Sequence, residues 1–155
     1  MRRAASRTGT LAMINRTVGM RVLWLAAAVY IFLWVPDLDL VFLDFLHHRS
    51  IITHSVLPAL VLLRMDPRTR AAPMAGALVG IGVHLSCDLL SPMIGYGQIW
   101  LPEPFQIPLG SLSYLWLAGN AILAFVWARR LSREAFPPRI APGVFAGAGG
   151  VTAVG

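Results

Sequence analysis

The sequence predicts an all-α, polytopic membrane protein with about four transmembrane helices in a compact bundle. Three observations favour this fold class: 57% of the residues are hydrophobic, only 13% are charged, and the apolar residues form long runs. Soluble domains carry about 25% charged residues. The runs show no period-two alternation, and only helices or closed barrels satisfy backbone groups in lipid, so strands are not expected.

Four apolar runs are candidates for these helices, at about residues 22–35, 51–63, 73–90 and 109–128. A helix that spans the bilayer needs about 20 apolar residues. The fourth run has that length, the first and third reach it with their polar ends, and the second is short. We therefore expect one transmembrane domain over residues 1–136 and a flexible, Pro-, Gly- and Ala-rich tail over residues 137–155.

The basic residues mark one side of the predicted bundle. All 13 are arginine, and 12 of them lie before the first run, between the second and third runs, or after the fourth run. Arginine beside membrane helices is typical of the cytoplasmic side. With four helices, the three clusters and both termini fall on that side. The clustering favours a lipid bilayer as partner and argues against nucleic acid, despite a net charge of +6.

Most acidic and imidazole side chains fall at the opposite, outer face of this predicted bundle. They come from the end of the first helix, the loop after it, the start of the second helix and the end of the third: Asp37, Asp39, His47, His48, Arg49, His54, His84 and Asp88. His84 and Asp88 are four residues apart, so both can reach one cation from a single helix stripe. Asp37 and Asp39 flank one leucine, a spacing that offers two oxygens at a helix end.

Aspartate together with histidine suits zinc, with manganese or iron as harder alternatives. Each motif also has a simpler interpretation: the Asp37/Asp39 pair as a helix cap or solvated loop, and His84 with Asp88 as a hydrogen-bonded helical pair. Ionisable groups at a membrane edge are costly unless they are paired or coordinated. Their convergence on one predicted face therefore favours a metal site.

Four short motifs occur in an order that resembles a known family. "PDLD", "HRSIITHS", "GIGVHLSCDLLSP" and "IWLPEP", within residues 35–104, resemble the YdjM-type family of inner-membrane, metal-dependent hydrolases. The resemblance implies a bacterial inner-membrane protein with a metal site formed by Asp37, Asp39, His48, His54, His84 and Asp88. It also implies that Arg49 and Thr53 lie beside the site. Ser50 stands where several members have glycine, which bears on the loop geometry.

The expected chemistry is hydrolysis by water that a divalent metal activates at the outer membrane face. Asp39 and Asp88 are the candidate general bases. Arg49, the only arginine expected on that side, suits a phosphate or carboxylate oxygen or a salt bridge to Asp44. A phosphoester or lipid-linked compound is the expected substrate. Six donors exceed what one tetrahedral zinc needs, so a two-metal site stays open.

Two other functions fit the same residues. A divalent metal-ion transporter would need its site near the membrane midplane with access from both sides, whereas the predicted donors gather at one face. A non-catalytic protein could use the metal only to clamp its helices together. The clamp predicts that loss of a donor unfolds the protein, whereas an enzyme can lose activity and stay folded.

Overall fold

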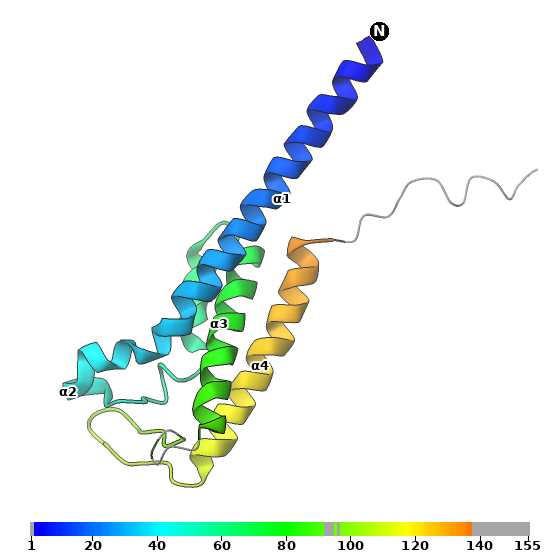
Figure 1. Cartoon of the computed structure of the whole chain (residues 1–155). Helices are drawn as coiled ribbons and strands as arrows, with labels where there is room; N and C mark the ends of the chain where they lie inside the picture. The colour runs from blue at the N-terminus through cyan, green and yellow to red at the C-terminus, as the bar shows by residue number, and fades with distance from the viewer. Residues whose placement is uncertain (1, 92–94, 96, 138–155) are drawn as a thin grey trace, which may run out of the picture.

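The computed structural model describes residues 2–91, 95 and 97–137. In chain order its elements are α1 (Arg2–Trp34), η1 (Val35–Phe42), α2 (Leu43–Leu46), η2 (Leu57–Arg64), α3 (Ala71–Leu90) and α4 (Leu112–Ala135), where η denotes a 3₁₀-helix (Figure 1). This part of the chain contains isolated bridges but no strand, so the predicted all-α class is confirmed. The predicted tail, residues 137–155, lies outside the described residues except for Pro137.

Among the described residues, three segments are long and apolar enough to cross a membrane: Arg16–Leu46, Ala71–Leu90 and Leu112–Ala135. Many of their side chains are large, apolar and more than half exposed, as at Tyr30, Leu115 and Ile122. Contiguous apolar surface of this extent marks an interaction site, and lipid is the natural partner for helices of this length. The chain is therefore a membrane protein, in agreement with its composition.

The prediction of a second spanning helix over residues 51–63 is wrong. Residues 51–56 form turns and bends, and only Leu57–Arg64 form a helix, of the 3₁₀ type. Ser55 supplies part of the reason, because its hydroxyl donates to Ile52 O at 2.6 Å and accepts from Leu57 N at 3.1 Å. Such local side-chain bonds offer the backbone an alternative to helical hydrogen bonds.

Helices α1 and α3 run parallel and touch through their backbones. A Cβ atom at Gly76 would lie 2.2 Å from Leu25 O, and one at Gly80 would lie 2.5 Å from Val29 O. Both pairs advance by four residues, so the two helices stay in step along the contact. Small residues four apart permit this close approach in membrane helices. Because α1 and α3 are parallel, the segment between them must return along the bundle, as Figure 1 shows.

Helix α4 runs antiparallel to α3 and covers its other side (Figure 1). A Cβ at Gly82 of α3 would lie 3.0 Å from the Phe125 ring of α4. Arg21 of α1 donates a hydrogen bond to the carbonyl of Ala135, the last residue of α4, at 2.7 Å. Arg21, which lies past the middle of α1, and the final turn of α4 therefore share one end of the three-helix bundle, and the cytoplasmic location of that end stays a prediction.

Replacing Gly80 with alanine tests the backbone contact between α1 and α3. The added methyl group would overlap Val29 O and Leu33 N, and overpacking of this kind costs about 1–3 kcal/mol. We expect Gly80→Ala to lower the free energy of unfolding by that amount in reversible denaturation in mixed micelles. Gly119→Ala in α4 is the matched control, because a Cβ there meets nothing within 4 Å. Equal losses in the two variants would contradict the contact.

Candidate metal centre

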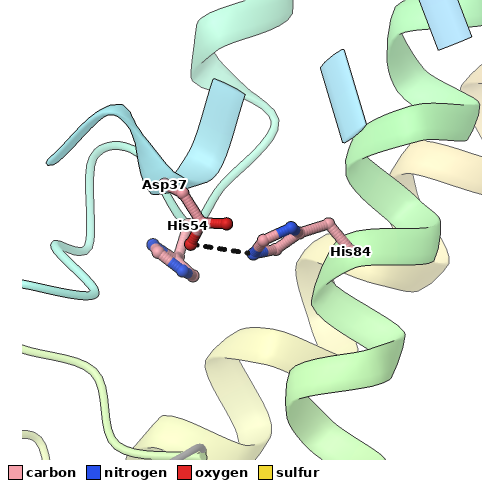
Figure 2. A group of neighbouring side chains, drawn as sticks. All are labelled: Asp37, His54 and His84. Carbon is pink, nitrogen blue, oxygen red and sulfur yellow. Dashed lines mark ion pairs between the residues drawn. The ribbon is translucent and has the colours of Figure 1, made fainter. Parts of the chain in front are cut away.

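Four donor side chains meet at the end of the bundle opposite Arg21. Asp37 comes from η1, His54 from the turn before η2, and His84 and Asp88 from the last two turns of α3. One ligand atom each from Asp37, His54 and His84 lie within 4.8 Å of one another. Figure 2 shows these three side chains facing a common point, with the ion pair between Asp37 and His84 dashed.

The distances between these donors fit one small cation. Asp88 Oδ2 lies 3.2 Å from His54 Nε2 and 3.4 Å from His84 Nε2, and His84 Nε2 lies 3.7 Å from Asp37 Oδ1. Bonds of about 2.0–2.1 Å to a tetrahedral ion place neighbouring donors about 3.4 Å apart. These three separations lie close to that value, so Asp37, His54 and His84 could hold one metal ion, with Asp88 at donor distance from both histidines.

Three of the four donor atoms face only one another. His54 Nε2, His84 Nε2 and Asp88 Oδ2 are buried and make no well-formed hydrogen bond within the described structure, although Asp88 Oδ2 lies 3.2 Å and 3.4 Å from the two Nε2 atoms. Buried polar atoms left unpaired are rare and destabilising. All three belong to the same cluster, and one cation would satisfy them together. The donor chemistry therefore fits a metal ion.

The imidazole of His84 is oriented by the contact between α1 and α3. Its Nδ1 lies 2.9 Å from the carbonyl of Leu33, the next α1 carbonyl four residues beyond Val29. Because a carbonyl only accepts, Nδ1 is the donor in this contact, and Nε2 is the ring nitrogen that faces the cluster. A backbone carbonyl behind a histidine ligand is a common way to fix its ring and tautomer.

His54 is oriented by a buried carboxylate behind it. Its Nδ1 lies 3.4 Å from Asp39 Oδ2 and 3.1 Å from the hydroxyl of Thr53, which itself donates to Asp39 Oδ2 at 2.9 Å. The backbone N–H of Ser50 also donates to that oxygen, at 3.0 Å. From α4, the indole N–H of Trp116 donates to His54 O at 2.9 Å. His54 is therefore held on both its ring and its backbone.

The electrostatics of His54 follow from this position. Burial by itself would lower the pKa of His54, but the hydrogen bonds and charges of Asp39 and Asp88 outweigh burial and raise it. Two carboxylates thus favour positive charge on this ring. The same field favours a bound cation, which would compete with the proton for Nε2.

The structure divides the six donors that the family resemblance implies. Asp37, His54, His84 and Asp88 form the cluster, whereas Asp39 and His48 lie behind it. His48 Nδ1 contacts Asp39 Oδ1 at 3.3 Å, with 36% of the His48 side chain exposed. Asp39 and His48 therefore do not join the other four.

Arg49 lies at the edge of the cluster. Its Nη2 atom is 3.8 Å from Asp88 Oδ1, on the carboxylate that also faces both histidines, and its Nη1 donates to Gly95 O at 2.7 Å. The salt bridge to Asp44 suggested by the sequence is replaced by this pair with Asp88. The guanidinium is largely buried, with 11% of the side chain exposed.

The turn that carries His48 and Arg49 has an unfavourable backbone. His47 and Arg49 have φ angles of 63° and 61°, a region that non-glycine residues rarely adopt. The loop before α4 holds the turn: Trp100 N donates to Arg49 O at 3.0 Å, and Ile51 N donates to Trp100 O at 2.9 Å. The ring of His47 stacks on Trp100, with 4.1 Å between centroids. Strain of this kind persists where surrounding contacts enforce it.

Several supporting groups were not predicted from the sequence. The Leu33 carbonyl carries no residue-type signal, so nothing in the sequence identifies it. Trp116 and Asn120 of α4 hold His54 O and Val56 N, at 2.9 Å and 3.1 Å. The available signal was the spacing: both residues can hydrogen-bond, and they lie four positions apart within the apolar part of α4.

Removing a donor should remove the metal. We expect detergent-purified wild type to contain about one divalent ion per chain, and His54→Ala and His84→Ala to lose most of it, because a structural or catalytic site needs its full donor set. Elemental analysis after size-exclusion chromatography measures this. His47→Ala is the matched control, since its ring stacks on Trp100 outside the cluster. Wild type without metal after supplementation would contradict the site.

Asp39 offers a sharper test, because it was predicted as a donor but lies behind His54. Loss of a residue that orients a ligand weakens metal affinity by about 10- to 100-fold, whereas loss of a donor should weaken it further. We expect Asp39→Asn to show the smaller effect and Asp37→Ala the larger, in competition with a chromophoric chelator. Equal and complete loss in both variants would make Asp39 a donor.

Comparison with known proteins identifies no relative: no family model, curated protein or solved structure matches this chain. Function is therefore inferred from the donor cluster and its surroundings.

Proposed function

We propose that this protein is a membrane-bound, metal-dependent hydrolase, and that its cofactor is zinc held by Asp37, His54, His84 and Asp88. One observation carries the proposal: three buried donor atoms, which face one another without well-formed hydrogen bonds, converge with a fourth, accessible carboxylate. Two imidazoles and two carboxylates in this spacing suit zinc, with manganese or iron as alternatives. When bound, such an ion would supply Lewis acidity and would lower the pKa of water enough to provide hydroxide, the attacking species, at neutral pH.

The residues in and around the cluster have different roles in this proposal. Asp37, with 35% of its side chain exposed, is the most accessible of the four donors and takes the proton from the attacking water through its second oxygen. Asp88, suggested as a base by the sequence, acts here as a donor, and Asp39 acts by orienting His54. Arg49, beside Asp88, binds an anionic oxygen of the substrate.

The substrate class follows from Arg49 and from the membrane. A guanidinium beside a metal donor suits a phosphoester, and a site at one end of a membrane bundle suits a lipid-linked one. The end that carries Arg21 and the final turn of α4 is the cytoplasmic end in this proposal, so the centre faces outward. The order of the sequence motifs, which resembles the YdjM-type family, supports a bacterial inner membrane as the location.

A divalent metal-ion transporter is the weaker candidate. The α3 donors His84 and Asp88 lie in the last two turns of a helix that ends at Leu90, whereas a carrier places its site near the midplane. A metal could also serve only to clamp the fold, because the donors come from three separate segments: η1, a turn and α3. The experiment below tests this alternative.

The test is hydrolysis by the metal-loaded protein in detergent, using p-nitrophenyl esters of phosphate, of phosphodiesters and of carboxylic acids. We expect turnover that chelation abolishes, and Arg49→Ala to lower kcat/KM for the phosphoester by about 10- to 100-fold through loss of a charged hydrogen bond. Arg68→Ala, in the loop between η2 and α3, is the matched control. Stoichiometric metal, no turnover of any ester and unfolding on chelation would establish the clamp instead.

A further inference from the structure

A strongly apolar segment stands beside the metal centre. We name residues Val35–Leu46, which form η1 and α2, the apolar arm. In Figure 1 the arm turns aside where α1 ends and projects from the bundle. Its exposed side chains, between 49% and 72% accessible, are Leu38, Leu40, Val41, Phe42, Leu43 and Phe45. The arm contains no basic residue, and its first aspartate, Asp37, is one of the four donors.

The loop before α4 extends this surface. The backbone N–H of Glu103 donates to Phe45 O at 3.0 Å, which ties the loop to α2. Phe105 and Ile107 on the same loop are 64% and 54% exposed. Aromatic and branched side chains from two segments thus form one apolar face at the end of the bundle that holds the metal centre.

The depth of this face follows from the helix contacts. Leu25, Val29 and Leu33 of α1 lie beside Gly76, Gly80 and His84 of α3, so the same register places Arg21 beside Ala72. From Ala72 to Asp88 the helix rises about 24 Å at 1.5 Å per residue. The hydrocarbon core of a bilayer is about 30 Å thick. If Arg21 marks one boundary of the core, the metal centre and the arm lie just inside the other.

We infer that the apolar arm is embedded in the bilayer at this boundary, and that the metal centre takes as substrate the ester group of a lipid in the same leaflet. The substrate part rests on the proposed hydrolase function. Lipid ester and phosphoester groups lie at the depth that the helix register gives the donors. Asp37 itself belongs to the arm and its side chain is 35% exposed, so an ester beside the embedded arm would lie next to a donor.

Lipid is the occupant that continuity favours. The candidate membrane span runs without a break from Arg16 to Leu46, through α1 and into the arm. Ile31 and Trp34, on the last turns of α1, are 55% and 59% exposed, so the lipid-facing surface of α1 passes directly into the arm. An apolar segment at an interface gains its binding energy from buried apolar area. Because the apolar arm carries aspartates and no basic residue, electrostatic attraction to anionic lipid does not contribute to its membrane binding.

Nitroxide accessibility tests the embedding. Cys87 is replaced by serine, and Val41→Cys or Leu38→Cys is labelled and reconstituted in phosphatidylcholine–phosphatidylglycerol vesicles. Both positions are exposed, at 72% and 50%, so labelling leaves the fold intact. Ile122→Cys on α4 gives the lipid reference, and Arg68→Cys gives the water reference. Collisions with oxygen report lipid, and collisions with a water-soluble nickel chelate report water.

We expect labels at Val41 and Leu38 to collide with oxygen as Ile122→Cys does and to be shielded from the nickel chelate. Nickel accessibility equal to that of Arg68→Cys would place the arm in water and overturn the inference. Shielding from both reagents, with spin–spin broadening, would place a second copy of the chain on the arm and overturn it equally.

The substrate part is tested on the same vesicles. We expect the metal-loaded protein to hydrolyse a long-chain phospholipid ester in the bilayer at least 10-fold faster than a short-chain, water-soluble analogue with the same head group. Equal rates would refute lipid access while leaving hydrolysis in place. An embedded arm with no hydrolysis of either ester would refute the proposed function and the lipid substrate, and leave the embedding.

Discussion

The backbone contact between α1 and α3 is the constraint on which the rest of the structure depends. Gly76 and Gly80 let the two helices approach until a methyl group no longer fits between them. The same four-residue step then brings His84 to the carbonyl of Leu33. The orientation of a candidate metal ligand is thus a continuation of helix packing. Because the helices are parallel, the chain between them must return along the bundle, and that return carries His54 into the cluster.

The sequence predicted the helices that packing in lipid requires. The runs at 73–90 and 109–128 correspond to Ala71–Leu90 and Leu112–Ala135, since long apolar runs in lipid have no alternative to the helix. The predicted helix at 51–63 does not form, because the side chains there bind other partners. Thr53 bonds to Asp39, His54 faces the cluster, and Ser55 bonds to the local backbone. Apolar content alone does not reveal that competition.

Within the site too, the sequence predicted what lies on a regular helix and missed what depends on local structure. The four-residue spacing of His84 and Asp88 predicted their convergence correctly, because both lie on a regular α-helix. Asp37 and Asp39 were expected to act together, but both lie on the helix η1, and residues two apart on a helix point in different directions. Asp37 therefore meets His84 and Asp39 meets His54 from behind. The sequence placed the pair at a helix end and did not predict that helical structure continues through both residues.

The close fit of α1 against α3 also bears on which ions the centre accepts. Sliding α3 by one residue would move its donors by about 1.5 Å, and the glycine contact leaves no room for that adjustment. The separation of 3.4 Å between the donors His84 and Asp88, both on α3, is therefore fixed by the helix frame, whereas Asp37 and His54 come from η1 and the turn before η2. Calcium takes six to eight oxygen ligands at longer distances, and magnesium requires an octahedron of oxygens. Two imidazoles among the candidate donors match neither preference, and the glycines of α3, which do not touch the cluster, fix where two of those donors stand.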